Sequence, residues 1–498
     1  MEAIVTSAEM REYERLLAES ECITELELMD RAASGIFSFL QKYYGSKKIL
    51  IVCGTGNNGG DGLAALHKLH RAGFDAAAAI VGENARLSPA AAHHLTLAEQ
   101  EGCRIDKTPQ TTILQQADVL VDCIFGIGLS REIEGRYANW INDVNAAEKT
   151  VISVDIPSGL DASTGHVLGC AIKADATVTF GFPKCGHFLQ QGKAYTGMLH
   201  VVPLTEKNVP FEAAAYRLTR AKVDEILPRR SPISHKGDNG RALLCVGSAQ
   251  YTGAALLASA AALRAGCGIL ESCVPGAVKA AFSQLPEVCC TAVNDGNDWE
   301  DGACSKAILR IAGKRAVGIG CGMGNGAIEP LLKAAINAGI PLVIDADGLN
   351  AIAMHPALRS TLHPNVILTP HPGEFSRLSG LTTAQILHDP IACAKKAARQ
   401  WHCIVLLKGA VSCITDGERL VLNTTGNAGL AKGGSGDVLT GIITGLLSQS
   451  VTPFDAACVG AYLLGSAAET AFDILKERAM LARDVLAGLT QTLSQPLL

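Results

Sequence analysis

The sequence has few aromatic residues, no dense run of lysine or arginine, and no cysteine pair of the zinc-binding CxxC type. Only 5% of its 498 residues are aromatic, while 48% are hydrophobic, so its cores must consist mainly of alanine and aliphatic side chains. The formal charge of −5 offers no basic footprint for nucleic acid, and we expect no such partner.

The 17 cysteines are scattered along the chain. We expect reduced, mostly buried thiols in a cytoplasmic protein. The first 20 residues are charged and amphipathic, unlike a signal peptide. No apolar run approaches the length that spans a bilayer, so we expect no membrane association.

Two series of alternating strands and helices follow one another, which predicts two α/β domains with parallel sheets. A proline-rich stretch at residues 203–240 separates the series and predicts domains at residues 1–215 and 222–498. Helices are predicted over residues 10–44 and after Tyr251, Ala327 and Asp437. Strands are predicted at residues 48–53, 76–81, 119–123, 150–154, 177–180, 242–246, 269–274, 316–319, 341–345, 366–369, 403–408 and 412–414.

Three strand ends of the first domain carry glycines together with acids or amides. The first is the loop GTGNNGGDG at residues 54–62, and the others begin at Asp122 and Asp155. The loop lacks both the GxGxxG spacing and the lysine of a P-loop. Amide and carboxylate oxygens suit a hard cation, and backbone N–H groups suit phosphate. One such aspartate can be a helix cap or a turn former, but three together predict a ligand site.

These motifs, GTGNNGGDG, DCIFGIGL, DIPSGLDASTG and TFGFPKCGH, resemble the NAD(P)H-hydrate epimerase domain over residues 5–205. The resemblance implies a Rossmann-like three-layer sandwich and a potassium ion held by Asn58, Asp122 and Ser158, although the residues alone do not select potassium. Asp155 is the best candidate for the acid/base that exchanges the C6 epimers. The residues implied to bind the hydrated cofactor are Asn57, Asn58, Gly59, Gly60, Asp61, Gly126, Ile127, Gly128, Leu129, Ser130, Arg131, Glu132, Tyr137 and Asp155.

Two residues of this domain leave alternatives open. Lys184 is either a counter-charge for phosphate or an ordinary solvated lysine at a turn. Ile127 occupies a position where the family often has threonine, which puts one hydroxyl contact to phosphate in doubt and leaves the backbone contacts intact.

In the second domain, Gly433, Gly434 and Gly436 precede Asp437, which precedes the apolar run 438–447. Glycine lets N–H groups crowd around an anion, and a helix N-terminus adds unpaired N–H groups. A carboxylate in such a cradle would repel phosphate, so it needs a task of its own. The natural task is general base toward a hydroxyl that is about to be phosphorylated.

Five further loops follow strands of this domain and are predicted to converge with residues 433–437 on one edge. Lys408 is a plausible charge for nucleotide phosphate. His371 is either a substrate contact or a structural histidine, and Glu374 is a pairing partner, a helix cap or a neighbour of magnesium. Asp345 and Asp347 have carboxylates suited to magnesium, but a turn role fits them equally.

The motifs SHKGDNGRALL, YTGAALLASAAALRAGCG, PLVIDADGLN, ILTPHPGEF, LLKGAVS and NTTGNAGLAKGGSGDVLTGII resemble the ribokinase-like ADP/ATP-dependent NAD(P)H-hydrate dehydratase over residues 222–495. One departure is GCGMG at residues 320–324, where the family commonly has proline and leucine. The resemblance implies that the hydrate contacts Ala254, Gly322, His371 and Asp437. It also implies that the nucleotide contacts Lys408, Gly409, Ala410, Val411, Ser412 and Gly436.

The sequence therefore favours a bifunctional repair enzyme. Its first domain would interconvert the R and S hydrates NADHX and NADPHX. Its second would dehydrate the S form with magnesium and a nucleotide, ADP being favoured over ATP. The alternative is a ribokinase-type small-molecule kinase fused to a nucleotide-binding sensor domain. We also expect a homo-oligomer.

Overall fold

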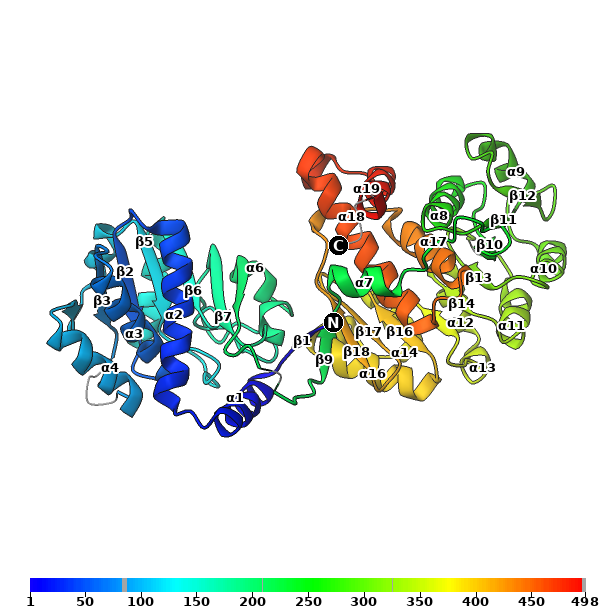
Figure 1. The fold of residues 1–498 in the computed structure, drawn as a ribbon. Coiled ribbons are helices and arrows are strands. Elements are labelled where there is room, and N and C mark those ends of the chain that lie inside the picture. The colour runs from blue at the N-terminus through cyan, green and yellow to red at the C-terminus, as the bar shows by residue number, and fades with distance from the viewer. Residues whose placement is uncertain (83–86, 208, 325, 495–498) are drawn as a thin grey trace. The chain divides into compact units, whose positions relative to one another are not determined.

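The computed structural model describes residues 1–82, 87–207, 209–324 and 326–494. The chain forms two compact units, Ala3–Ala214 and Met1–Glu2 with Ala215–Leu498 (Figure 1). Each unit is a largely parallel sheet covered by helices, which confirms the predicted α/β class with two domains.

The described part of the N-terminal unit contains a seven-stranded sheet in the order β4-β3-β2-β5-β6-β7-β8, in which all neighbours are parallel. Its strands are β2 (Ile49–Cys53), β3 (Ala76–Ile80), β4 (Arg104–Asp106), β5 (Val119–Cys123), β6 (Thr150–Val154), β7 (Ala176–Phe180) and β8 (Met198–Val202). Its helices are α1 (Ser7–Glu21), α2 (Glu25–Tyr44), α3 (Asn57–Arg71), α4 (Pro89–Gln100), α5 (Gly135–Ala146) and α6 (Gly192–Thr196).

Helices cover both faces of this sheet. Alternate residues of β2, Leu50 and Val52, pack with Trp140 and Ile141 of α5, while α3 packs against β2 from the other side and contacts α2 and α4. The chain builds outward from β2 to β4 and then returns to β5 beside β2. The carboxyl ends of β2 and β5 therefore form a topological switch point, where open α/β sheets bind ligands.

The C-terminal unit contains an eleven-stranded sheet among its described residues, in the order β1-β9-β18-β17-β16-β15-β14-β13-β10-β11-β12. Pairing is parallel from β12 to β16 and antiparallel along β16-β17-β18. The strands are β1 (Glu2–Ile4), β9 (Ala215–Arg217), β10 (Arg241–Cys245), β11 (Ile269–Val274), β12 (Cys289–Ala292), β13 (Ala316–Ile319), β14 (Leu342–Ile344), β15 (Val366–Leu368), β16 (Ile404–Leu407), β17 (Ser412–Thr415) and β18 (Leu420–Asn423).

The direction of the sheet order reverses between β10 and β13, so the loops after these strands form the switch point of this unit. The helices are α7 (Arg220–Ile226), α8 (Thr252–Arg264), α9 (Gly276–Lys279), α10 (Asp301–Ile308), α11 (Glu329–Asn337), α12 (Ala346–Met354), α13 (Pro356–Arg359), α14 (Pro372–Ser379), α15 (Thr383–His388), α16 (Pro390–Trp401), α17 (Ser435–Ser448), α18 (Pro453–Ala479) and α19 (Ala482–Ser494).

Helix α17 is the central helix of the C-terminal core, because every residue from Val438 to Ser448 is buried. It packs on α8, α18 and the strands β10, β13 and β14. A Cβ atom added to Gly441 would lie 2.1 Å from the carbonyl oxygen of Ala258. Glycine is therefore required for the close approach of α17 to α8, which fixes the position of the α17 N-terminus.

Helix α18 corrects one expectation from the sequence. Among the described residues, it is the one helix that is long enough and apolar enough, by length and composition alone, to cross a membrane. However, 56% of its most apolar window is buried inside the structure, and residues such as Val459 and Leu463 belong to the hydrophobic core. A helix in the core of a folded protein can meet the same criteria of length and composition, and α18 is such a core helix.

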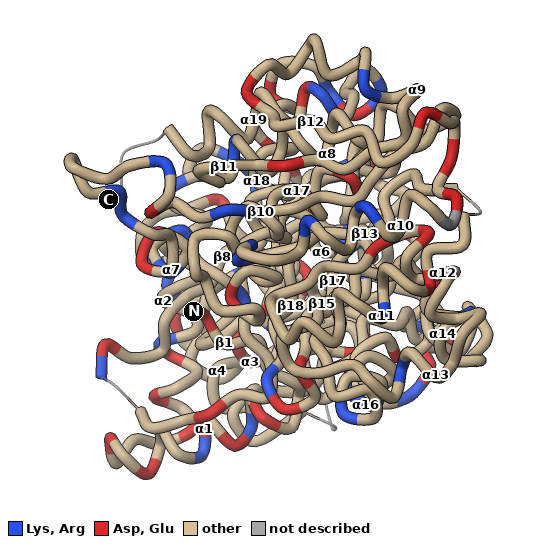
Figure 2. Tube along the Cα trace, turned by 90° about the vertical axis from the view of Figure 1, so that its right-hand side faces the viewer, with Lys and Arg blue, Asp and Glu red and all other residues tan. Residues whose placement is uncertain are grey.

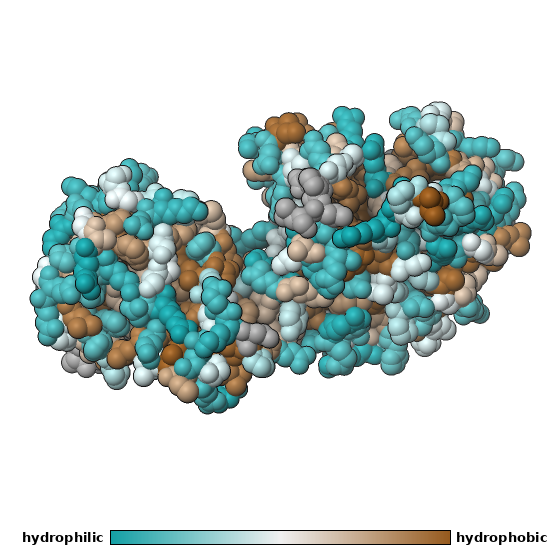
Figure 3. Space-filling model, in the orientation of Figure 1, coloured by the Kyte–Doolittle hydropathy of each residue, from teal (hydrophilic) through white to brown (hydrophobic). Residues whose placement is uncertain are grey.

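The surface is mixed in charge and polarity. Figure 2 shows acidic and basic residues interspersed along the trace, without a continuous basic stripe. The face drawn in Figure 3 is mainly hydrophilic with scattered apolar residues. Exposed side chains such as Ile233 and Leu309 are of the isolated kind that folded proteins commonly carry. None of the 17 cysteines, all of which lie within the described residues, forms a disulfide.

The contact between α17 and α8 gives a stability prediction. We expect Gly441→Ala to lower the free energy of unfolding by about 1–3 kcal/mol, because the methyl group would displace the backbone of α8. Gly302→Ala, at an exposed position of α10, is the matched control, since no atom lies within 4 Å of its added Cβ. It should gain up to about 1 kcal/mol from helix propensity. Denaturant unfolding would measure both, and equal effects would contradict the packing argument.

Candidate active sites

The first site begins where β2 runs into α3. A Cβ on Gly54 would lie 2.0 Å from the carbonyl oxygen of Ile124, and one on Gly59 would lie 2.0 Å from that of Gly54. Only glycine permits such close approach of the backbone at these two positions. The resulting turn places residues 57–61 at the start of α3. Free N–H groups and the positive end of the helix dipole therefore face the switch point. Asn57 is tied to α2 by a hydrogen bond of 2.6 Å from its side-chain amide to Glu25.

Asp122, at the end of β5, is buried and heavily hydrogen-bonded. Its carboxylate accepts from the hydroxyl of Ser153 at 2.8 Å and from the hydroxyl and N–H of Ser158 at 2.6 and 2.9 Å. Burial raises the pKa of Asp122, and the hydrogen bonds from Ser158 and Ser153 partly offset that rise. The predicted pair Asp122 and Ser158 is thus brought into direct contact.

Asn58, in the first turn of α3, has neither side-chain polar atom satisfied. It is 7% exposed, and its amide oxygen and nitrogen have no hydrogen-bond partner. A Cβ on Gly126 would lie 3.4 Å from Cγ of Asn58 and 2.9 Å from Oδ2 of Asp155, so Asn58 and Asp155 flank the same loop. A buried amide oxygen without a partner, in a site that also contains buried carboxylates, fits a hard monovalent or divalent cation.

Lys184 proved to be neither of the two alternatives drawn from the sequence. It is fully buried, and its ammonium group lies 2.8 Å from Oδ1 of Asp155. It also donates to the hydroxyl of Thr179 at 2.8 Å and to the carbonyl oxygen of Phe180 at 3.0 Å. Its three donors therefore have three acceptors, and the lysine acts as the counter-ion of Asp155.

Asp155 is held as a carboxylate in a special backbone conformation. Its φ angle is +66°, a left-handed value that aspartate tolerates better than most residues. The N–H of Ile127 donates to Oδ2 at 3.1 Å. Burial opposes ionisation, but the charge of Lys184 and these hydrogen bonds outweigh it and set the pKa of Asp155 below its usual value.

Two other acids near Asp155 are shifted in the opposite direction. Burial and the charge of Asp155 raise the pKa of Asp61 well above its usual value. The same two causes raise the pKa of Glu14, in α1, to about 7. One site therefore contains an ionised carboxylate and acids that retain protons near neutral pH. Such a separation of pKa values allows one carboxyl group to act as a base and another as an acid.

The loop after β5 supplies the remaining predicted residues. Gly126 and Ile127 contact Asp155. Leu129 and Tyr137 are half-buried against the apolar cluster of α5. Four other predicted residues are exposed beside the site, namely Gly128, Ser130, Arg131 and Glu132.

The second site is a cavity of about 830 Å³ at the switch point of the C-terminal unit. Three of the four residues predicted to contact the hydrate line it, namely Ala254, Gly322 and Asp437. The sequence did not predict several other lining residues, including Ser248, Asp298, Trp299 and Glu300. Asp298–Glu300 come after β12, a strand of only four residues that the sequence pattern did not predict. Ser248 stands out only in the structure, where its hydroxyl group is buried and has no hydrogen-bond partner.

Asp437 lies inside α17 and not before it, because the helix begins at Ser435 after Gly434 with φ +99°. Its side chain is in the first turn, where a carboxylate is favoured by the helix dipole. Burial and the charge of Asp345 nevertheless raise its pKa to about 6, against the hydrogen bond from the thiol of Cys321 and the charge of Lys408. Asp437 can therefore exchange a proton near neutral pH.

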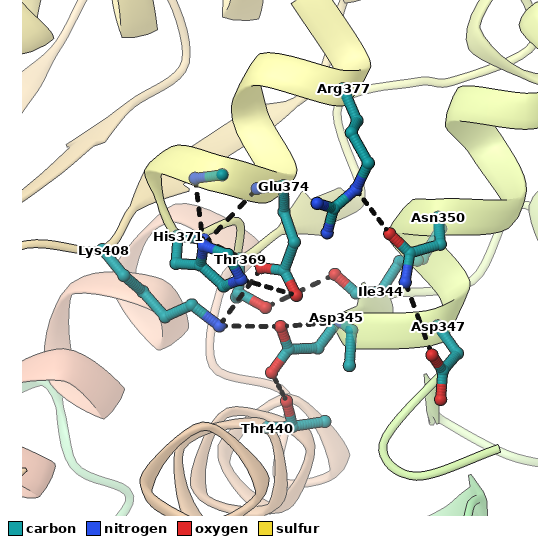
Figure 4. A network of polar contacts seen from close by, with 12 residues as sticks. Ile344, Asp345, Asp347, Asn350, Thr369, His371, Glu374, Arg377, Lys408 and Thr440 are labelled. Atoms are coloured by element: carbon teal, nitrogen blue, oxygen red, sulfur yellow. Dashed lines mark hydrogen bonds and ion pairs between the residues drawn. The ribbon is translucent and has the colours of Figure 1, made fainter. Parts of the chain in front are cut away.

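Lys408 forms the centre of a polar network (Figure 4). Its ammonium nitrogen lies 2.8 Å from Oδ1 of Asp345 and 3.8 Å from Oε2 of Glu374. Burial disfavours its charge, but Asp345 and Glu374 outweigh burial and raise the pKa of Lys408. A Cβ on Gly436 would lie 3.5 Å from this nitrogen, so the structure brings Lys408 and Gly436 together, and their contact with a nucleotide stays a prediction.

His371 acts as a helix cap in the structure. Its Nδ1 accepts from the N–H groups of Gly373 and Glu374 at 3.0 and 3.4 Å, and Glu374 accepts from the N–H of His371. The side chain is 53% exposed and does not line the cavity, so its substrate contact stays a prediction. The same holds for four residues of the loop after β16, namely Gly409, Ala410, Val411 and Ser412.

Comparisons with known proteins match this arrangement. The family model described as NAD(P)H-hydrate dehydratase matches residues 242–491, and that described as YjeF-related protein N-terminus matches residues 25–186. A bifunctional NAD(P)H-hydrate repair enzyme of Moorella thermoacetica is 36% identical over 97% of this chain and 95% of its own length. One of Escherichia coli is 32% identical over 97% and 92%.

The chain belongs to the bifunctional NAD(P)H-hydrate repair enzyme family. Among solved structures, the ADP/ATP-dependent NAD(P)H-hydrate dehydratase of Bacillus subtilis, co-crystallised with ATP and Mg²⁺, is 32% identical. It covers 56% of this chain and 98% of its own, with a TM-score of 0.49.

The buried pair in the N-terminal site of this family member gives a second stability prediction. We expect Lys184→Met to lower the free energy of unfolding by about 3–5 kcal/mol, because it leaves Asp155 buried without its counter-ion. The double variant Lys184→Met/Asp155→Asn should lose less, and Lys173→Met, at an exposed lysine, should be near neutral. A loss below about 1 kcal/mol for Lys184→Met, typical of surface pairs, would contradict the assignment.

Proposed function

We propose that this chain repairs hydrated NADH and NADPH. The N-terminal unit interconverts the R and S epimers of NADHX and NADPHX, and the C-terminal unit dehydrates the S form with ADP or ATP. The observation that carries the proposal is Asp437, a carboxylate with a pKa of about 6 that faces a cavity of 830 Å³ from the first turn of α17. The full-length similarity to bifunctional relatives supports the pairing of activities.

Dehydration needs a good leaving group, since hydroxide is a poor one. Asp437 accepts the proton of the C6 hydroxyl while the oxygen attacks the terminal phosphorus of the nucleotide. The bond between that phosphorus and its bridging oxygen breaks, so that AMP leaves from ADP, or ADP from ATP. The C6–O bond of the resulting ester then breaks, and its electron pair leaves with phosphate. The N1 lone pair stabilises the cation, and transfer of the C5 proton to water restores the 5,6 double bond.

The residues around Lys408 support nucleotide binding. Lys408 supplies a positive charge, and Gly436 leaves room for the approach of a phosphate to the N-terminus of α17. The carboxylate of Asp347 lines the cavity and has the chemistry of a magnesium ligand. A magnesium ion bound with the nucleotide would neutralise charge on the transferred phosphoryl group. ADP in preference to ATP stays a prediction.

In the N-terminal unit, Asp155 is the proposed acid/base of epimerisation. Asn58, Asp122 and Ser158 offer oxygen ligands that fit the predicted potassium ion, and the unpartnered amide of Asn58 supports a cation there. Such an ion would supply positive charge near the bound phosphates. Cytoplasmic localisation, independence of membranes and the homo-oligomeric state also stay predictions.

A ribokinase-type kinase would share the glycine–aspartate helix start, so turnover must discriminate the two functions. We expect racemic hydrate with ADP or ATP to yield reduced cofactor and inorganic phosphate in equal amounts, measured by nicotinamide absorbance and a phosphate assay. Full recovery indicates both activities, whereas half recovery indicates dehydration alone. Accumulation of a phosphorylated product would establish the kinase alternative.

Asp437 gives a sharper test of the dehydratase mechanism. Its role as base requires the ionised form, so the rate should fall as the pH drops below about 6. Asp437→Asn should reduce kcat by at least about 100-fold while nucleotide binding, measured by calorimetry, persists. Asp298→Asn is the matched control, because it removes another acid of the cavity without removing the proposed base. Turnover retained by Asp437→Asn would exclude Asp437 as the base.

A further inference from the structure

Helix α1 is hydrogen-bonded to two loops beside the proposed epimerase site of the N-terminal unit. The N–H of Ser7 donates to the hydroxyl of Ser163 at 3.0 Å, and Arg11 donates to the carbonyl oxygen of Ile127 at 3.3 Å. Ile127 is the residue whose N–H holds Asp155. Glu14 lies three residues after Arg11 and therefore on the same face of α1. Arg11 places this face of α1 beside the Ile127 loop that holds Asp155, and the charge of Asp155 acts on Glu14.

Glu14 differs from the other glutamates of α1. Glu9 caps its own helix and binds the N–H of Ala214. Glu12 and Glu19 pair with Arg15, and Glu21 pairs with Arg31. Among the described residues, no hydrogen bond or ion pair is formed by the half-buried carboxyl group of Glu14. The structural roles that explain its neighbours therefore do not explain Glu14.

Charged groups from several elements face Glu14. Burial and Asp155 raise its pKa most, Glu25 of α2 adds to the rise, and Lys184 and Arg11 oppose it. Glu14 in turn raises the pKa of Asp61 in α3. The net result is a pKa of about 7, so the carboxyl group is partly protonated at neutral pH. Asp155, paired with Lys184, is ionised over the same range.

A second observation indicates that a ligand belongs among these acids. The amide of Asn58 is more than nine-tenths buried, has no partner, and borders the Gly126 loop that also touches Asp155. A buried amide without a partner costs free energy unless a ligand satisfies it. The acids therefore surround a place where a polar ligand is expected.

We propose, on the basis of the epimerase function above, that Glu14 is the catalytic acid that protonates the C6 hydroxyl of the hydrated nicotinamide. Asp155 is its counterpart, the base that receives a proton from the water that enters on the opposite face. The two residues belong to different elements, which allows one to serve each face of the ring.

The step balances without an oxidant or a further reactant. The hydroxyl at C6 is attached to the carbon next to N1, so it is the hydroxyl of a carbinolamine. Glu14 gives its proton to this oxygen, the C6–O bond breaks with its electron pair on the departing water, and the N1 lone pair forms a double bond to C6. A water molecule then adds to the other face of C6, and its proton passes to Asp155. In the reverse direction the two carboxyl groups exchange roles.

Asp61 is the rival proton donor, and its environment distinguishes it from Glu14. The pKa of Asp61 lies well above its usual value because burial and three other acids act on it. Proton transfer is most efficient from a group whose pKa is near the working pH, which is the position of Glu14. Asp61 is better suited to remain protonated and to donate a hydrogen bond.

The test is the rate of epimer exchange in the full-length protein as a function of pH, followed by chromatography of the two epimers without nucleotide. The wild-type rate from the epimer served by Glu14 should fall as the pH rises through about 7, because the acid loses its proton. Glu14→Gln should lower the rate by about 100-fold or more and remove this pH step. Glu14→Asp should retain the step at a reduced rate.

Glu19→Gln, an exposed position of the same helix, should match the wild type in both rate and pH profile. A thermal unfolding curve and the recovery of cofactor from pure S hydrate verify that each variant is folded. If Glu14→Gln exchanges epimers within threefold of the wild type, or if Asp61→Asn and not Glu14→Gln removes the pH step, Glu14 is not the acid. If the wild type exchanges no epimers, the epimerase function itself is overturned.

Discussion

A lysine–aspartate pair, buried in the N-terminal unit and partly buried in the C-terminal unit, organises the charge of each site. Lys184 and Asp155 are 2.8 Å apart in one unit, and Lys408 and Asp345 are 2.8 Å apart in the other. A buried charge is tolerated only when an opposite charge and hydrogen bonds compensate for lost water. Each lysine is paired with its aspartate. A second acid nearby is affected by burial and by the negative charge of that aspartate: Glu14 by Asp155, and Asp437 by Asp345.

The consequence is that chemically similar carboxyl groups differ in their pKa. The pKa of Asp155 is lowered, while those of Glu14 and Asp437 are raised to about 7 and about 6. These values lie near neutral pH, where proton exchange is most useful to catalysis. The two units are unlike in sheet order, yet in both the pKa of one acid is raised toward neutrality by the same two causes, burial and a neighbouring carboxylate.

Backbone packing then holds these groups in place. The N-terminus of α17 carries Asp437 and is fixed because Gly441 lets α17 approach the backbone of α8. The loop at Gly126 lies against Asp155 for the same reason, since a side chain there would collide with the carboxylate. The two proposed functions complement each other, because hydration of the nicotinamide ring yields two epimers and the dehydratase is proposed to accept one.

The sequence by itself determined the two α/β units, twelve of the strands and the loops that carry the sites, because hydrophobic periodicity and glycine-rich turns are local signals. It missed β1, β4, β8, β9, β12 and β18, which have only three to five residues. Tertiary structure alone decided that Lys184 is buried against Asp155, that His371 caps α14, and that Asp298 and Glu300 reach the cavity. Burial and ion pairing join residues from distant segments, so no local pattern reveals which carboxyl group keeps its proton.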